Sequence, residues 1–430
     1  MKYLLVNGEK QKIPPFPHHK NYIYRCKQFF FAKGMFTQMT MANFISIKEL
    51  LRGWRYKCSI PRSLLIDPTS SCNLKCKGCW AADYDNGDNL SYEKMDDILT
   101  QSEKLGVLDC LMTGGEPLIR KKDIVKLCEK HRRTQFGVFT NATLIDEAFA
   151  DDMARLGNLN VYISIEGTRE QTDFRRGEGV YDQAIAAMDI LKSRGIAFGF
   201  SACYHAKNYE TIASDEFLDL MRQKGCWFGW LFNYVPIGSD ADLSLVCTPE
   251  QRAYMQQKIA AYSLKNDYVI IDFWNNGHLS FGCVAAGTGF LHINAKGDVE
   301  PCAFCHYSDS NIHEVSLLDA LRSNFMTAFR AAQPFSKNPL RACPLVDVPE
   351  AIIKVVNESG AHSTHLAHPE TPEMLAAKTS GLSQQWEPMA AELFTKMPEH
   401  NQKNFPKYLN YQQFKTKHTD GRRSKRDKNV

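Results

Sequence analysis

The chain has 430 residues and a formal net charge of +4, from 52 basic and 48 acidic residues. This near balance excludes a general nucleic-acid-binding protein, whose basic residues would be in clear excess, and we expect no nucleic-acid partner. No apolar run reaches the length of a membrane span, and the start lacks a signal-peptide pattern. We therefore expect a cytoplasmic protein whose 14 cysteines act as ligands or free thiols rather than in disulfides.

Residues 1–57 are predicted to form an N-terminal arm and an amphipathic helix. The arm has three prolines within residues 10–20, and the helix is expected over 22–51. Aromatic residues at 29–31 stand among basic ones, a pattern that allows peripheral contact with a membrane surface. Packing of the apolar face against the body of the protein is the alternative that we favour, because tertiary packing is the usual use of amphipathicity.

Residues 58–237 alternate strand and helix patterns, which predicts parallel βαβ units. The expected strands cover 64–67, 107–112, 136–139, 160–163, 197–203 and 228–234, and helices are expected between them over 91–105, 122–133, 146–156, 181–193 and 215–223. About six such units fit an incomplete (β/α) barrel. In barrel-like α/β folds the functional groups gather at the carboxyl ends of the strands.

Three cysteines follow the first of these strands on a loop, with the spacing C-x3-C-x2-C. They are Cys72, Cys76 and Cys79. The polar residues between them argue against a buried core segment, and the spacing is not a usual one for zinc. Compact cysteine runs of this kind hold iron–sulfur clusters. Since a cubane has four irons, three thiolates leave one iron open to another ligand.

Polar groups also end the next strands of the predicted barrel. The second strand ends in a Gly-Gly-Glu-Pro segment, where two glycines let the backbone come close to a ligand. The third ends at Thr140-Asn141, the fourth at Ser164-Ile165-Glu166-Gly167, and the pair Arg175-Arg176 follows. Either guanidinium matches the geometry of a carboxylate.

Together, the cysteine spacing and the Gly-Gly-Glu-Pro segment resemble the radical SAM superfamily. The resemblance implies a [4Fe–4S] cluster on the three cysteines, with S-adenosylmethionine (SAM) chelating the open iron. It also implies that the amino group of SAM binds at Gly114, Gly115, Glu116 and Pro117. Ser164, Glu166 and the arginine motif resemble a sequence pattern of the peptide- and cofactor-maturing branches, in which a serine and an arginine help to hold SAM. By its position in this pattern, we expect Arg176 to have the role of that arginine.

Two further positions bear on how the nucleoside of SAM would be bound. Asn141 matches a polar strand end that faces the nucleoside in this superfamily. The family usually has an aromatic residue just before the third cysteine, against the adenine. Here that position is Gly78, and Trp80 after the cysteine is the candidate for the adenine contact.

A second group of cysteines lies in residues 281–350, after a connector helix and strand over 238–280. Cys283, Gly297 and Cys302 read C-x13-G-x4-C, and Cys305 and Cys343 follow. This pattern resembles the SPASM/twitch extension of radical SAM proteins. It implies one auxiliary [4Fe–4S] cluster on Cys283, Cys302 and Cys343, with Cys305 or an open iron in the fourth position. A zinc ribbon on the same four thiols is the alternative.

Residues 351–430 are expected to be a C-terminal tail, partly disordered, with histidines in a solvated loop and a basic run at 422–426. The resemblance as a whole implies an oxidoreductase-like enzyme that cleaves SAM reductively and abstracts a hydrogen atom from a peptide, protein or cofactor precursor. It also implies an electron donor such as flavodoxin or ferredoxin. A lipid- or other small-molecule-modifying enzyme at the membrane surface remains an alternative, and so do a non-catalytic redox carrier or sensor and a zinc-stabilised interaction module.

Overall fold

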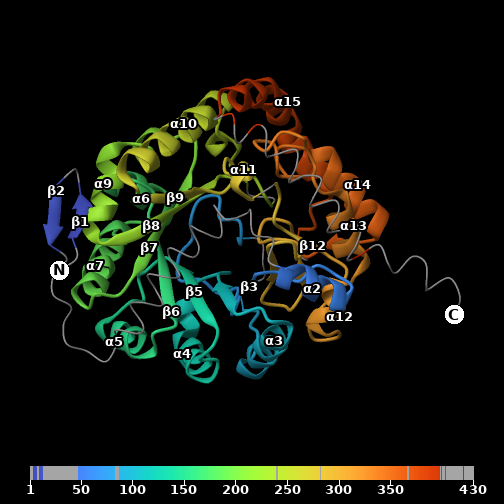
Figure 1. Ribbon diagram of the computed structural model, residues 1–430, viewed down its shortest axis with the longest axis horizontal. Coiled ribbons are helices and arrows are strands. Elements are labelled where there is room, and N and C mark those ends of the chain that lie inside the picture. Colours follow the sequence, from blue (N-terminus) through green and yellow to red (C-terminus); the bar gives the residue numbers. More distant parts are fainter. Residues whose placement is uncertain are drawn as a thin grey trace, which may run out of the picture.

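One curved sheet organises the fold. The computed structural model describes residues 3–6, 9–12, 47–82, 87–238, 241–280, 282–365, 368–397 and the single positions 399, 402 and 420. Its main sheet has nine strands in the order β11-β10-β3-β4-β5-β6-β7-β8-β9. Strands β3 to β9 run parallel to one another, β10 joins β3 in parallel, and β11 pairs with β10 antiparallel. Figure 1 shows the helices arranged around the outside of this sheet, as in an open barrel.

The strands of this sheet are β3 (Ser63–Ile66), β4 (Asp109–Met112), β5 (Gln135–Thr140), β6 (Leu159–Ser164), β7 (Phe198–Tyr204), β8 (Cys226–Asn233), β9 (Val269–Asp272), β10 (Phe290–Ile293) and β11 (Val299–Glu300). The small strands are β1 (Tyr3–Val6) with β2 (Glu9–Lys12), and β12 (Tyr307–Ser308) with β13 (His362–Ser363). All six positions of β6 are buried, as expected for a parallel strand covered on both faces.

The helices of the barrel are α3 (Tyr92–Leu105), α4 (Lys121–Lys130), α5 (Glu147–Leu156), α6 (Arg169–Arg176), α7 (Val180–Ser193), α8 (Tyr209–Ile212), α9 (Asp215–Lys224) and α10 (Pro249–Asn266). The other helices are α2 (Ile47–Tyr56), α11 (Gly277–Ser280), α12 (Leu317–Leu321), α13 (Asn324–Ala332), α14 (Pro349–Ser359) and α15 (Pro372–Lys396), with short 3-10 turns η1 (Pro117–Arg120) and η2 (Leu243–Leu245). Side chains cap several of them: Ser91, Asp146 and Ser214 each accept a hydrogen bond from a backbone N–H of the first turn.

The barrel prediction is confirmed, because all six expected strands are present in one parallel sheet. Residues 317–332, between Cys305 and Cys343, form two helices, α12 and α13, where the helical pattern of 316–330 predicts a single one. They separate because Ser323 caps a new helix by accepting from the Met326 N–H at 3.2 Å. Of the helix predicted over 22–51, only residues 47–51 are described, and they belong to α2; the arm before it lies outside the described residues apart from β2.

Residues 349–397 are more ordered than the expectation of a C-terminal tail. Helix α14 contributes Ile352, Val355 and Val356 to the main core, and α15 buries Trp386 and Leu393 in a second apolar cluster. Apolar residues at helical spacing bury one face of such a helix. The described part of this region is therefore an outer layer of the fold (Figure 1). Within the described ranges, none of the helices combines the length and the apolar character needed to cross a membrane.

A buried charged group joins the second cysteine region to the barrel. Strand β10 pairs with β3 in the register Phe290 with Ser63 to Ile293 with Ile66. His292 of β10 is fully buried; it lies 3.0 Å from Asp67 Oδ1 after β3 and 2.6 Å from Glu300 Oε2 of β11. Thr364 donates to the other oxygen of Glu300 at 2.5 Å. Buried charges are tolerated when they are paired in this way.

The charge of His292 should make stability depend on pH. Burial alone would lower the pKa of His292, but the carboxylates of Asp67 and Glu300 outweigh it and raise the pKa from 6.5 to about 10. Because the folded state holds this proton more tightly than the unfolded state, the stabilisation is complete below pH 6.5 and is lost as the pH rises towards 10.

We therefore predict that His292→Gln lowers the free energy of unfolding by about 3 kcal/mol at neutral pH, since two buried carboxylates lose their cation. The difference between the variant and the wild type, followed by thermal unfolding midpoints, should shrink as the pH is raised from neutrality towards 10. A difference that stays constant over this range would contradict the ion-pair assignment.

Candidate functional site

One cavity of about 460 Å³ brings together groups that are far apart in the sequence. Both cysteine groups line it, namely Cys72, Cys76, Cys79, Cys283, Cys302, Cys305 and Cys343. Of the other candidate residues, Gly114, Gly115, Glu116, Asn141, Ser164 and Arg176 also line it, whereas Pro117 and Glu166 do not. The cavity thus runs through the barrel, from the carboxyl ends of the strands at Thr113, Asn141 and Ser164 to the amino ends at Ser63 and Asp109.

The loop that carries the first three cysteines packs tightly on the glycines after β4. The Gly115 N–H donates to Thr69 O at 3.0 Å, and the Glu116 N–H donates to Ser71 O at 2.9 Å. A Cβ atom on Gly115 would lie 2.1 Å from Ser71 O, and one on Gly114 would lie 2.6 Å from Thr69 O. No larger residue fits at either position without moving the cysteine loop.

Glu116 is buried and links the ends of β4 and β5. Its carboxylate accepts from the Leu118 N–H at 3.0 Å, the Thr140 hydroxyl at 2.7 Å and the Asn141 N–H at 2.8 Å. Pro117 follows as the first residue of the 3-10 turn η1. The Asn141 side chain in turn donates to Asn73 Oδ1 of the cysteine loop at 2.9 Å.

Glu166 does not line the cavity itself, but it forms ion pairs with two arginines that do. It is fully buried and accepts from Arg175 Nη1 at 2.9 Å, Arg176 Nε at 2.8 Å and the Cys203 N–H at 3.0 Å. Burial would raise the pKa of Glu166, but Arg176 and Arg175 outweigh it and lower the pKa, so the carboxylate is ionised. Both arginines line the cavity, and Arg175 O accepts from the Lys77 N–H of the cysteine loop at 2.8 Å.

The cysteines form two electrostatically coupled groups of free thiols, one on each side of the cavity. Burial, together with neighbouring acidic groups, raises the pKa of Cys72 and Cys283 to about 11 and of Cys343 to about 12. Metal binding must therefore displace protons from these thiols. In the part of the chain that is described, no three His, Cys, Asp or Glu side chains form a group that could hold a single metal ion. The two thiol groups fit iron–sulfur clusters in donor type, which are thiolates.

A buried ion pair supports the last cysteine. Arg252 of α10 pairs with Asp347, and the Cys343 N–H donates to Asp347 Oδ2 at 3.1 Å. Arg252 Nη2 also donates to Leu340 O at 3.1 Å, just before the same loop. Arg252 and Asp347 are 7% and 0% exposed, so neither charge is solvated.

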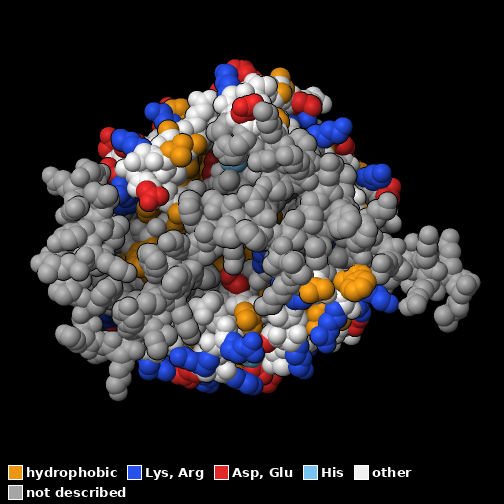
Figure 2. All heavy atoms as spheres, in the orientation of Figure 1, with side chains coloured by type: hydrophobic (Ala, Val, Ile, Leu, Met, Phe, Trp, Pro, Cys, Tyr) orange, Lys and Arg blue, Asp and Glu red, His pale blue; other side chains and the backbone are white. Residues whose placement is uncertain are grey.

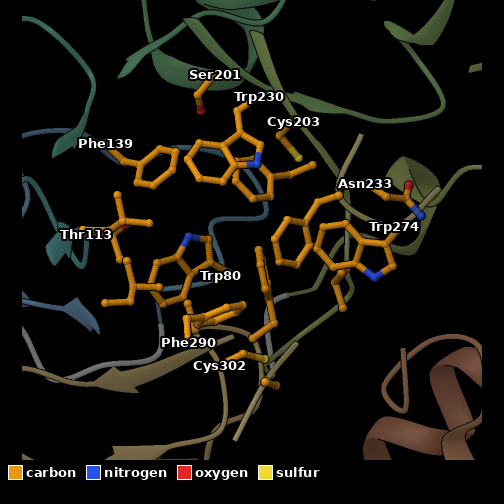
Figure 3. A pocket seen from close by; sticks show the side chains of 18 of the residues that line it. Trp80, Thr113, Phe139, Ser201, Cys203, Trp230, Asn233, Trp274, Phe290 and Cys302 are labelled. Atoms are coloured by element: carbon orange, nitrogen blue, oxygen red, sulfur yellow. The ribbon is translucent and has the colours of Figure 1, made fainter. Parts of the chain in front are cut away.

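Several aromatic rings line the cavity, among them Trp80, Phe139, Trp230, Trp274 and Phe290 (Figure 3). Trp80 lies 5.9 Å from both Phe304 and His306, measured between ring centroids, and so faces the second cysteine region. The space beside Gly78 is taken by Tyr234, whose ring would be 2.6 Å from a Cβ atom there. The aromatic ring next to the third cysteine thus comes from the end of β8. The aromatic residues at 228–234 predicted a strand that ends at Tyr234, but they did not indicate that its ring lies beside the third cysteine.

The histidines expected in a solvated loop are divided between two environments. His362 is exposed, as expected. His365 is 1% exposed, and its ring centroid lies 4.1 Å from that of His306, so the prediction is wrong for this residue. Because β12 pairs with β13, the segment that carries His362 and His365 lies beside the strand that follows Cys305.

Comparison with known proteins identifies two domains. Residues 66–221 match the radical SAM superfamily, and residues 283–344 match SPASM, an iron–sulfur cluster-binding domain. The AdoMet-dependent heme synthase of Methanosarcina barkeri is 23% identical over 288 residues, which cover 59% of this chain and 80% of that protein. The PqqA peptide cyclase of Gluconobacter oxydans is 25% identical over 317 residues, which cover 66% and 83% of the two chains. A protein of Archaeoglobus fulgidus is 35% identical, but the match spans only 35% of its length.

Solved structures share the fold. SuiB of Streptococcus suis bound to S-adenosylmethionine has a TM-score of 0.55 at 19% identity, covering 69% of this chain and 77% of that one. The anSMEcpe structure with bound AdoMet has a TM-score of 0.51 at 16% identity, covering 77% and 99%.

The chain is a radical SAM superfamily enzyme with a C-terminal SPASM domain. The first domain binds a [4Fe–4S] cluster and SAM, and the second indicates an auxiliary iron–sulfur cluster. The two matched domains favour a radical SAM enzyme over the non-catalytic carrier and the zinc-stabilised module considered from the sequence.

Removal of the charge on Glu166 should weaken SAM binding. In Glu166→Gln, two buried guanidinium groups lose their counter-charge and their fixed positions, which costs about 3 kcal/mol where a buried pair is broken. We expect SAM affinity to fall by about tenfold or more, measured by equilibrium dialysis of the reconstituted protein. Glu170→Gln, on the exposed surface of the same helix α6, should bind SAM like the wild type. Equal affinities in the two variants would contradict the role given to Glu166.

Loss of Arg252 should affect the two clusters unequally. Arg252→Met leaves Asp347 buried without its cation, so the loop that carries Cys343 should lose its fixed position. Iron analysis and EPR should then show loss of the auxiliary cluster with retention of the SAM-binding cluster. Arg155→Met, at a half-exposed arginine of α5, is the control. Full loading of both clusters in Arg252→Met would show that the ion pair is not needed there.

Proposed function

We propose that this chain cleaves SAM at a cluster held by Cys72, Cys76 and Cys79 and abstracts a hydrogen atom from a peptide or cofactor precursor. The observation that carries this proposal is the convergence of these cysteines, the glycines after β4 and two arginines on one cavity. When bound, the cluster and SAM supply a 5′-deoxyadenosyl radical, and the protein supplies ligation, orientation and exclusion of water.

The residues around the open iron suit the polar end of SAM. Gly114 and Gly115 line the cavity and pack directly on the cysteine loop, so their backbone carbonyl groups are placed to accept hydrogen bonds from the amino group. Arg176 and Ser164 line the same cavity, and a guanidinium oriented by Glu166 can bind the methionyl carboxylate. Asn141 and the ring of Tyr234 stand at the neighbouring strand ends and would face the nucleoside. Glu116 and Glu166 orient these groups from behind.

The second cysteine group would hold one auxiliary [4Fe–4S] cluster across the cavity. Cys283, Cys302 and Cys343 are proposed as ligands. We assign the fourth position to Cys305, because its thiol lines the same cavity and its electrostatic neighbours include the other three. The auxiliary cluster would close the open side of the barrel, where it can bind substrate or pass electrons.

The relatives support the substrate class named here. They include heme synthases and a peptide cyclase, which act on a cofactor precursor or a peptide according to their names. The reaction also needs a reductant, and a cytoplasmic flavodoxin or ferredoxin is the donor that we propose.

Formation of 5′-deoxyadenosine tests the proposed activity. Anaerobically reconstituted protein, reduced with dithionite and given SAM, should form 5′-deoxyadenosine, detected by mass spectrometry. Cys76→Ala should reduce this to background, because the cluster loses one of its three ligands. Cys128→Ala, at a buried thiol of α4 away from the cavity, should stay active. Fully iron-loaded wild-type protein that forms no 5′-deoxyadenosine would contradict the proposal.

A further inference from the structure

The part of the cavity beyond the SAM-binding residues has walls suited to a flat ring. Phe139 of β5 lies 5.1 Å from Trp230 of β8, and Trp230 stacks with Phe232 at an interplanar angle of 23°. Figure 3 shows Phe139 and Trp230 on one side of the cavity and Trp80 and Phe290 on the other. Aromatic walls favour an aromatic or conjugated guest, because stacked and edge contacts add to the burial of apolar area.

Asp109 provides a free acceptor on this wall. Two acidic residues line the cavity among the described residues, Glu116 and Asp109. Glu116 is occupied by three hydrogen bonds, whereas Asp109 Oδ1 accepts from the Ser63 hydroxyl at 3.3 Å and Oδ2 has no hydrogen bond to a described residue. Asp109 is half-buried in the cavity lining, and desolvation raises the pKa of its carboxyl group to about 7.

Trp230 adds an unpartnered donor to the cavity lining. Its Nε1–H is buried and has no hydrogen-bond partner among the described residues. A buried polar group without a partner costs free energy until a ligand or water satisfies it. The cavity lining therefore combines aromatic faces with polar groups that have no partner among the described residues: Asp109 Oδ2 and Asn233 Oδ1 as acceptors, and the Nε1–H groups of Trp230 and Trp274 as donors.

We propose that this cavity binds a planar conjugated ring between Phe139, Trp230 and Phe290, with an N–H group of the ring donating to Asp109. This inference rests on the proposed function, since it describes the substrate of the same site. Extended peptide backbone fits the wall less well, because each residue brings an N–H and a C=O that need partners and the aromatic wall offers few. The ring belongs either to a small cofactor precursor or to an aromatic side chain of a peptide.

A matched pair of probes tests the hydrogen bond. Indole and benzofuran have the same shape, but benzofuran has an oxygen where indole has its N–H. In equilibrium dialysis against the anaerobic holoenzyme with SAM, indole should bind about tenfold more tightly, as a hydrogen bond to a carboxylate predicts. Equal binding of the two probes, or no binding of either, would overturn the proposal.

Substitutions test whether Asp109 causes the preference for indole over benzofuran. Asp109→Leu should abolish the preference for indole while benzofuran binds as before, and Trp230→Leu should weaken both probes; iron content and circular dichroism confirm that each variant is folded. Asp151→Leu, on the exposed face of α5, should keep the preference. A preference that survives in Asp109→Leu would overturn the assignment.

Two further measurements identify the source of the ring and test the proposed function independently of the ring site. A blocked Gly-Trp-Gly peptide that binds more tightly than indole identifies a peptide side chain as the ring, and weaker binding identifies a small molecule. The 5′-deoxyadenosine assay is run on the same wild-type preparation. Protein that cleaves SAM but does not discriminate between the probes contradicts only the ring site, whereas discrimination without SAM cleavage contradicts only the proposed function.

Discussion

The pairing of β10 with β3 is the constraint on which the rest of the site depends. A parallel barrel has its functional end at the carboxyl termini of the strands, and β3 delivers Cys72, Cys76 and Cys79 there. Because β10 runs parallel to β3 and β11 returns antiparallel, the chain before and after the β10–β11 hairpin lies towards the amino end of β3, and His292 between Asp67 and Glu300 fixes this pairing. Cys283 and Cys302 therefore lie towards the end of β3 opposite to the first three cysteines, and both groups line the same cavity.

Buried carboxylates fix the shape of this site. Glu116 joins the ends of β4 and β5, and Glu166 orients two arginines and the end of β7. Asp347 does the same for the loop of Cys343 through Arg252. Each is paired or hydrogen-bonded, as a buried charge must be. Asp109 differs from these three, since one of its oxygens has no partner among the described residues, and this difference motivates the proposed ring site.

The sequence predicted the barrel and its cysteines because these depend on local patterns: alternating elements, strand-end glycines and thiol spacing. It did not reveal that β10 joins β3, since pairing between segments more than 200 residues apart has no local signal. The same holds for Tyr234, which fills the space beside Gly78, and for Arg252, whose partner is Asp347. Helices α14 and α15 were missed because their polar flanks resemble a solvated tail, although one face of each is buried.

The most direct test of the account asks whether SAM binds the open iron of the first cluster. Electron–nuclear double resonance would be recorded on reduced Cys343→Ala protein, which isolates that cluster, with SAM labelled by 15N at its amino group. The account predicts a 15N coupling to the cluster that disappears when unlabelled SAM replaces it. A cluster that is reduced and saturated with SAM, yet shows no such coupling, would contradict the assignment of Cys72, Cys76 and Cys79 as a three-cysteine site with an open iron.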